Sequence, residues 1–375
     1  MNTLENILQE KVNAFVEKSQ IDANKVYDSL INRQIADWII PSSAMNFHKD
    51  DSGIRVSVRE GDQFHDWGLT GYSVYQIAQM LGLPPGWVKE SYLTGEGFQK
   101  ESVTYALNQY VENVRKNDDR FLIRNVGGNV RGFLSTAYKR MNTQELFLTF
   151  LQAAMRLGLP ITGAVEGDSK DFLEVLDPRL IYVETPKNGL VAYARGAQLR
   201  NSDFGAGKLE LRTYSKHAVC LNGAIGQSYL KEIHLGSRLG QEIVYSIETI
   251  NKETEVRSLQ IRDIMNHIFS DRTRNFEEAQ IIEASGTEVN ITKEIERLPS
   301  LGLYKVEAKA VEGVLLEHKE EDGIIGSPSK WLMGQAVSAI AREAEPVRRR
   351  ELETIAGGYI YTHSPEEMAL INFEN

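Results

Sequence analysis

Four closely spaced segments between residues 172 and 215 have the pattern of β-strands, and they constrain the fold more than any other feature of the chain. Their sequences are FLEVL at 172–176, RLIYVET at 179–185, LVAYARGAQL at 190–199 and KLELRTYS at 208–215. The turn-forming residues Pro186-Lys187-Asn188-Gly189 lie between two of them and predict a β-hairpin. Two further strands around Gly127-Gly128 are expected, so the chain predicts an antiparallel sheet from about residue 120 to about residue 240.

Segments with the helical spacing of apolar residues flank these strands, at 4–16, 74–81, 146–157, 258–285 and 330–345. Asn142 followed by Glu145 is a variant of the capping box and predicts a helix start there. The predicted fold class is therefore α+β, a central antiparallel sheet flanked by helices. Three regions are expected: an N-terminal region of helices and strands at 1–110, a core domain at 111–345 and a C-terminal tail at 346–375, with a break in regular structure at Gly357-Gly358.

Basic residues are concentrated in two stretches of an acidic protein. Residues 190–240 hold seven Lys/Arg and three acids, and residues 115–140 hold seven Lys/Arg and two acids, giving +4 and +5. The whole chain carries −10, which leaves −19 for all other residues. Charge separated in this way creates a local positive field on a negative surface. Aromatic residues are interleaved with the cations, as a site for single-stranded nucleic acid requires.

The strand at 208–216 illustrates the predicted binding surface. Alternation places leucines on one face, and Lys208, Arg212, Tyr214 and Lys216 on the other together with Glu210. Such a face can hold a phosphate backbone and stack a base, although a solvated face whose cations pair with nearby acids explains the pattern equally well. The residues predicted to bind nucleic acid are Arg124, Arg131, Tyr138, Lys139, Arg140, Arg195, Arg200, Lys208, Arg212, Tyr214, Lys216, His234 and Arg238.

Other kinds of site have weak support. His217 and Cys220 are three residues apart, but no second pair has zinc-ligand spacing, and the apolar neighbours of Cys220 favour a buried thiol. The sequence has no GxxxxGK[ST] and no GxGxxG after a strand, so no metal, ATP or NAD cofactor is predicted. One cysteine, no secretory pattern and no apolar run of membrane-spanning length indicate a cytosolic protein.

Four segments share their order and spacing with a known family: LTGYSVYQIAQMLGLPPGWV, FLSTAYKRMNTQELF, RNSDFGAGKLELRTYSKHAVCLNG followed by IHLGSR, and SPSKWLMGQAVSAIARE. Together they resemble the phage- and plasmid-like proteins catalogued as a domain of unknown function, over residues 35–345. The most specific part is Arg200, Asn201, Ser202, Gly205, Arg212, Val219, Cys220, Asn222, Gly223, His234, Gly236, Ser237 and Arg238. The resemblance implies a mobile-element context in a bacterial cytoplasm, where such proteins often serve replication or recombination.

Three functions remain open from the sequence. The favoured one is a non-enzymatic, oligomeric protein of phage or plasmid type that binds single-stranded nucleic acid, with DNA favoured over RNA, and takes part in strand annealing or recombination. The second is an enzyme acting on nucleic acid or nucleotides, with Asn222, His217 or His234 in its site. The third is a protein that blocks a host factor through its acidic surface.

Overall fold

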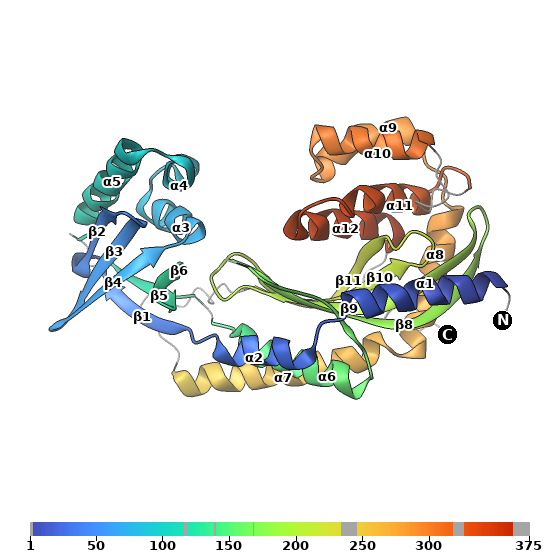
Figure 1. Ribbon diagram of the computed structural model, residues 1–375, viewed down its shortest axis with the longest axis horizontal. Coiled ribbons are helices and arrows are strands. Elements are labelled where there is room, and N and C mark those ends of the chain that lie inside the picture. The colour runs from blue at the N-terminus through green and yellow to red at the C-terminus, as the bar shows by residue number, and fades with distance from the viewer. Residues whose placement is uncertain are drawn as a thin grey trace.

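The computed structural model in Figure 1 describes residues 3–115, 119–138, 140–167, 169–233, 246–317 and 326–362 of the 375-residue chain. Helices and two mostly antiparallel sheets make up these residues, which confirms the predicted α+β class. The strands expected to form one sheet divide between the two, because those before residue 140 and those after residue 160 belong to different sheets. Each sheet is the centre of one lobe (Figure 1).

The first sheet has six strands in the order β1-β5-β6-β4-β3-β2. Its pairs are antiparallel except β4 with β6, which run parallel. The strands are β1 (Ala36–Pro41), β2 (Met45–Asp50), β3 (Gly53–Glu60), β4 (Gln63–Leu69), β5 (Arg120–Val126) and β6 (Asn129–Ser135). β5 and β6 lie beyond residue 110, so the first lobe extends past the expected boundary of the N-terminal region.

Three helices and a short 3₁₀ helix cover the apolar side of this sheet, and all contribute to one hydrophobic core. They are η1 (Ser42–Ala44), α3 (Gly71–Leu81), α4 (Pro85–Thr94) and α5 (Gly97–Arg115). α3 begins with a capping box in which Thr70 and Ser73 bond to each other's backbone N–H, and it ends at Gly82 in the left-handed conformation. α3 also contacts the second sheet, through Gln76.

The second sheet has five antiparallel strands that neighbour each other in chain order, which is a meander. They are β7 (Ile161–Glu166), β8 (Asp171–Thr185), β9 (Gly189–Asn201), β10 (Lys208–His217) and β11 (Gly223–Ile233). The hairpin predicted at Gly189 is confirmed as the β8–β9 connection. The two segments predicted at 172–176 and 179–185 are one strand with a register shift between Leu176 and Leu180.

Helices cover both faces of the second sheet. α2 (Ala23–Asn32), α6 (Thr143–Arg156), α7 (Ile247–Ile268) and α8 (Asp271–Gly286) pack on one face. α1 (Thr3–Ser19) and α12 (Pro346–Ile360) lie on the other face. The helix predicted at 258–285 is therefore two helices, separated at Phe269 and Ser270, where Ser270 caps α8 by accepting from Thr273 N.

The remaining helices form a small bundle at the end of the described chain. These are α9 (Ile291–Arg297), η2 (Leu298–Leu301), α10 (Lys305–Glu317) and α11 (Lys330–Ala341), and α12 completes their core. The predicted break at Gly357-Gly358 is wrong, because both glycines lie inside α12. Gly357 is needed there for contact, since a Cβ would lie 1.9 Å from the backbone oxygen of Ile225 on β11. Residues 346–360 are thus part of the core and not of a C-terminal tail.

The tip of the β9–β10 hairpin, residues 201–207, joins the two lobes. The Gln76 Nε2 of α3 donates to the Phe204 carbonyl at 2.7 Å, and Arg124 Nη1 of β5 donates to the Asp203 carbonyl at 2.6 Å. Phe204 is fully buried. The hairpin tip therefore acts as a buried connector between the sheets, and its glycine-rich sequence serves this packing.

The Asp203 side chain also caps the N-terminus of α6. The backbone N–H of Thr143 donates to Asp203 Oδ1 at 2.8 Å. Asn142 occupies the N-cap position, but its side chain makes no cap hydrogen bond and instead accepts from Arg124 Nη2 at 3.0 Å. The predicted helix is confirmed, whereas the predicted capping box with Glu145 is wrong, because a residue distant in sequence provides the cap.

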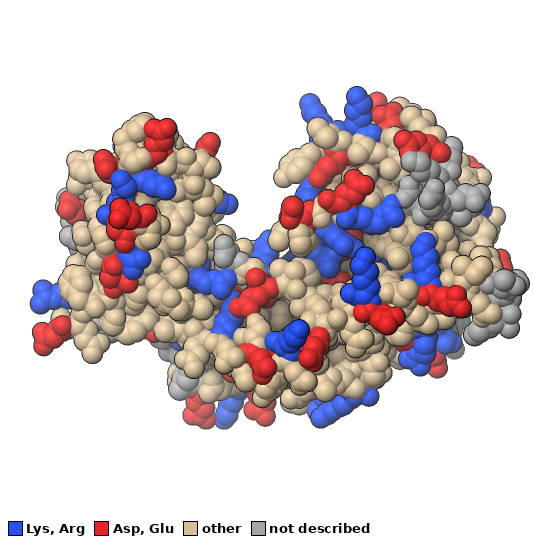
Figure 2. Space-filling view, in the orientation of Figure 1, with Lys and Arg blue, Asp and Glu red and all other residues tan. Residues whose placement is uncertain are grey.

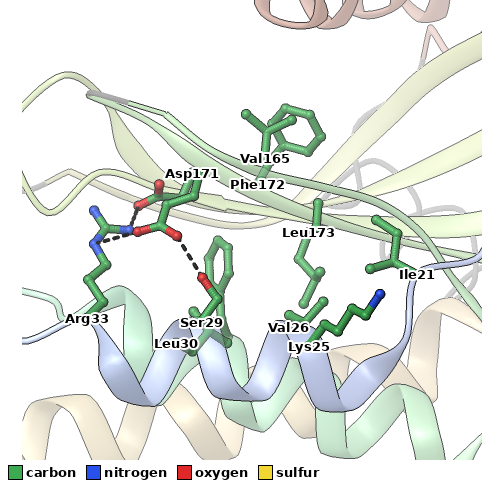
Figure 3. A pocket seen from close by; sticks show the side chains of 13 residues that line it. Ile21, Lys25, Val26, Ser29, Leu30, Arg33, Val165, Asp171, Phe172 and Leu173 are labelled. Carbon is green, nitrogen blue, oxygen red and sulfur yellow. Dashed lines mark hydrogen bonds and ion pairs between the residues drawn. The ribbon is translucent and has the colours of Figure 1, made fainter.

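Buried ion pairs complete this connection, which we call the joint. Arg33 Nη1 lies 2.7 Å from Asp171 Oδ2, and Arg124 Nε lies 2.8 Å from Asp37 Oδ1. Figure 3 shows Arg33 facing Asp171 beside a pocket of about 200 Å³ between α2 and β8. The ionic members of the joint are three arginines and four carboxylates: Arg33, Arg124, Arg140, Asp37, Glu166, Asp171 and Asp203.

Candidate functional site

A charged cluster covers the face of the second sheet that lies toward α12. Figure 2 shows a hollow between the two lobes, with Lys and Arg side chains gathered over the β9–β10 hairpin and beside α12. Seven cations and three carboxylates form what we call the basic cluster, with a formal charge of +4: Arg200, Lys208, Arg212, Lys216, Lys231, Arg349, Arg350, Glu174, Glu210 and Glu353.

Strand register brings the cluster together. Glu210 on β10 lies directly opposite Arg200 on β9 and Lys231 on β11. Directly opposed residues in antiparallel strands project from the same face. These three residues therefore form one row across the sheet. The next row contains Glu174 on β8 and Arg212 on β10, which both lie opposite Gln198 on β9.

Glu210 is the carboxylate at the centre of the first row. Arg200 Nη2 and Arg212 Nη2 each lie 2.5 Å from Glu210 Oε2, and Lys208 Nζ lies 2.9 Å from Oε1. Burial acts to raise the pKa of Glu210, but the attraction of Arg212, Arg200 and Lys208 outweighs it and holds the pKa below its ordinary value. One ionised carboxylate thus faces three cations, which leaves an excess of positive charge.

The second half of the cluster connects the sheet to α12. Arg350 Nη2 lies 2.5 Å from Glu174 Oε2, and Arg350 Nη1 lies 2.9 Å from Glu353 Oε2. Arg349 Nε lies 3.1 Å from Glu353 Oε1. Arg212 Nη1 donates to Thr354 on α12 at 3.0 Å and so bridges the two halves.

Accessibility divides the cluster into solvent-facing and buried cations. The side chains of Arg200, Lys208 and Arg349 are 33%, 29% and 29% exposed, and Lys231 is exposed. Arg212 and Lys216 are buried. The exposed members lie on β9, β10, β11 and α12, so the excess charge of the cluster reaches solvent.

Three residues of the predicted binding face are buried and cannot stack or grip a ligand from solvent. Tyr214 is 2% exposed and packs with α1. Burial lowers the pKa of Lys216 to about 8, and its Nζ donates to the Leu221 carbonyl at 3.0 Å. Arg212 is held by Glu210. The alternation was correctly predicted, but the assumption that this face is exposed at Tyr214 and beyond is wrong, because α1 and α12 cover it.

Arg195 lies on the opposite face of the sheet from Arg200. Its Nε lies 2.6 Å from Glu277 Oε2 on α8, and both residues are buried. The contrast follows from spacing, because residues five apart in a strand project from opposite faces. Arg195 therefore does not belong to the surface that was predicted for it.

The predicted residues of 115–140 meet the hairpin, but mostly inside the protein. Arg124 is buried in the joint, and Arg131 lies 4.7 Å from the centroid of the Phe204 ring. Tyr138 Oη donates to the Ser202 carbonyl at 3.0 Å while its ring stays partly exposed. Arg140 is 18% exposed and pairs with Asp37. Lys139, His234 and Arg238 lie outside the described residues.

Sequence reasoning missed five members of the cluster: Lys231, Arg349, Arg350, Glu174 and Glu353. Lys231 lies in the basic stretch, and its position opposite Glu210 depends on the β10–β11 register. The run Arg348-Arg349-Arg350 is visible in the sequence, but only the packing of α12 on β11 brings two of its residues to the sheet. Periodicity within one segment carries no signal for such a meeting.

The histidine and cysteine noted in the sequence form a buried pair. His217 Nδ1 lies 3.1 Å from Cys220 Sγ. Burial lowers the pKa of His217 to about 4 and raises the pKa of Cys220 to about 12, so imidazole and thiol are both neutral near pH 7. The interpretation of Cys220 as a buried thiol is confirmed. Within the described ranges, His, Cys, Asp and Glu form no group of three that could hold a metal ion.

The comparisons with known proteins add no relative to these observations. Neither the family models, nor the curated proteins, nor the solved structures match this chain. Among the described helices, none is long and apolar enough to cross a membrane. The resemblance to the phage- and plasmid-like family therefore stays a prediction from the sequence.

Proposed function

We propose that the protein binds single-stranded nucleic acid in the hollow between its lobes, with the phosphate backbone on the basic cluster. The observation that carries this proposal is the excess of seven cations over three carboxylates on one sheet face, with Arg200, Lys208, Lys231 and Arg349 reaching solvent. Because the chain as a whole is −10, attraction of a polyanion requires such a local excess.

The arginine and lysine side chains of the cluster suit the phosphates of a nucleic acid better than the carboxylates of a partner protein. Arginine offers two parallel N–H donors to a phosphate, and lysine offers a mobile point charge. Arg200 and Arg349 each bond one carboxylate in the structure, which fixes the side chains and leaves other guanidinium N–H groups for a ligand. Strand annealing or recombination, an oligomeric state and a cytoplasmic location belong to the same proposal.

An enzyme built on His217 or Asn222 has less support. Both side chains are buried, at 6% and 2% exposure, and Asn222 Nδ2 donates to the Gln335 carbonyl at 3.3 Å. A substrate would have to displace α11 to reach them. The host-factor alternative rests on the net negative charge alone, and no described surface specifies a partner for it.

Fluorescence anisotropy with labelled single-stranded and duplex oligonucleotides across a salt series tests the proposal. The wild-type protein should prefer the single strand, and its affinity should fall steeply with salt. The double variant Lys208→Ala/Lys231→Ala should weaken binding about tenfold or more. Its salt slope should be shallower by about 0.7 for each phosphate that is no longer neutralised by a lysine.

The matched control is Lys252→Ala/Arg262→Ala, which removes the same charge from α7 on the opposite face of the sheet. It should bind as the wild type does. Absence of salt-dependent binding by the wild-type protein would contradict the proposed function. An equal decrease in affinity in both double variants would contradict the proposed location.

A further inference from the structure

An uncharged pocket adjoins the basic cluster at the tip of the β9–β10 hairpin. Its volume is about 280 Å³, and α3 and β6 of one lobe and the hairpin of the other contribute its walls. The residues of interest in its lining are Tyr72, Gln79, Met80, Ser135, Tyr138 and Gly207. All the residues that line it are uncharged, although the surrounding surface is rich in ionised groups.

Buried hydrogen bonds hold the two sides of this pocket in place. Gln76, at its base, donates through Nε2 to the Phe204 carbonyl at 2.7 Å and accepts from Phe133 N at 3.0 Å. Gly205 approaches so closely that a Cβ there would lie 2.6 Å from Leu134 Cδ2. The pocket is therefore a fixed feature of the contact between the lobes and does not require a ligand to form.

The lining combines flat rings with groups that can form hydrogen bonds. Tyr72 and Tyr138 supply phenol rings, and both are partly exposed. Burial and the neighbouring Tyr75 raise the pKa of Tyr72 to about 12, so this phenol brings no negative charge near pH 7. Gln79 and Ser135 are exposed and offer an amide and a hydroxyl. Such a lining matches a neutral, planar ligand with polar edges.

The cations begin where the pocket ends. Gly207 is followed directly by Lys208, the first residue of β10 and a member of the basic cluster. The Lys170 side chain packs beside Gly207 and is itself exposed. A polymer that carries planar groups on a charged backbone fits this arrangement, with its phosphates outside and one planar group inside.

We infer that the pocket receives one unstacked nucleobase of the bound strand, between Tyr72 and Tyr138. This inference rests on the proposed function and makes it specific, because it assigns the cluster to the backbone and the pocket to a base. Base–aromatic stacking contributes about 1–3 kcal/mol per base, which corresponds to about 5- to 150-fold in affinity.

The experiment compares an oligothymidylate with a strand of equal length whose bases are replaced by abasic sites. Tyr72→Ala, which removes one wall, and Ser135→Leu, which fills the pocket, should weaken the base-containing strand by at least fivefold. Both variants should bind the abasic strand as the wild type does. Tyr105→Ala, at an exposed tyrosine of α5 outside the pocket, is the control and should change neither affinity.

Tyr72→Phe keeps the ring and should retain wild-type affinity for both strands, and thermal unfolding of each variant shows that the fold is intact. Wild-type affinity of Tyr72→Ala and Ser135→Leu for the base-containing strand would overturn the pocket while leaving the proposed function in place. Failure of the wild-type protein to bind either strand at low salt would overturn both.

Discussion

The joint and the basic cluster contain the same types of charged residue, but they differ in the balance of cations and carboxylates. In the joint, three arginines face four carboxylates around the buried hairpin tip. In the cluster, seven cations face three carboxylates, and several of the cations reach solvent. Four charges of the joint, Arg33, Arg124, Asp171 and Asp203, are buried, and buried charges with enough opposite partners can position chain segments. An excess of one sign at the surface produces a field that acts on a ligand.

The largest expected effect comes from breaking the joint at Asp203. Asp203→Ala removes the carboxylate that faces Arg33 and Arg124 and also the cap of α6 at Thr143. Since two buried guanidinium groups lose a partner, the free energy of unfolding should fall by about 3–5 kcal/mol. Urea denaturation measures it. Glu248→Ala, at an exposed ion pair on α7, is the control and should change it by less than about 0.5 kcal/mol.

Two arginines of β9 show the difference between a buried and a partly exposed ion pair within one strand. Arg195 and Arg200 each pair with a glutamate at 2.6 Å or less, but Arg195 is buried under α8 and Arg200 is partly exposed. Arg195→Ala leaves Glu277 buried without its cation, so a loss of about 3 kcal/mol or more is expected. Arg200→Ala leaves Glu210 with two other cations and should cost about 1 kcal/mol or less. Similar losses in both variants, measured by urea denaturation, would contradict the distinction.

Asp171 makes the stability of the joint depend on pH. Burial, only partly offset by Arg33, raises its pKa from the ordinary 3.8 to about 6, with Asp203 and Glu166 adding to the rise. The folded protein binds the proton more tightly than the unfolded chain. The contribution of Asp171 to the free energy of unfolding is therefore fully present below the ordinary pKa and is lost as pH rises through about 6.

The loss amounts to about 3 kcal/mol for a shift of about two pKa units. Asp171→Asn removes this titration, so the difference in unfolding free energy between wild type and variant should change by that amount between about pH 4 and about pH 7. Parallel pH profiles of the two proteins would show that Asp171 titrates normally.

The smallest expected difference in unfolding free energy is between alanine substitutions at two glycines that share one backbone angle. Gly205 in the joint and Gly128 in the β5–β6 turn both have a φ of 82°, but a Cβ at Gly205 would meet Leu134 at 2.6 Å, while one at Gly128 would meet nothing within 4 Å. Gly128→Ala should cost about 1 kcal/mol for the left-handed conformation. Gly205→Ala adds a steric clash and should cost about 1–3 kcal/mol more, by thermal unfolding. Equal costs would argue against the close approach of the hairpin tip to β6.

Local patterns in the sequence predict the helices and strands well, but they do not predict which of these elements contact each other. The β8–β9 hairpin and the alternation of Lys208 to Lys216 follow from residues that are neighbours in the chain, and the structure contains both. β5 and β6 belong to the first sheet because β6 pairs with β4, although α3, α4, α5 and β5 separate these two strands in the chain. No local period reports such a contact.

The candidate site shows the same limit. The predicted alternation identifies Lys208, and the basic stretch at 190–240 identifies Arg200 on the neighbouring strand; both side chains reach solvent. It gives no information on which helix covers the face, so Tyr214 was expected at the surface although α1 buries it. Arg349 and Arg350 belong to the site because α12 packs on β11. Only the tertiary structure reveals this packing.

Lysine footprinting tests most directly whether the cluster, and not the opposite face of the sheet, contacts nucleic acid. The rate of acetylation is measured for Lys208, Lys231 and Lys252 with and without a saturating single-stranded oligonucleotide. Strong protection of Lys208 and Lys231, with Lys252 on α7 unchanged, is the predicted result. Equal protection of all three lysines, or none at Lys208 and Lys231 while the strand is bound, would contradict the assignment of the cluster.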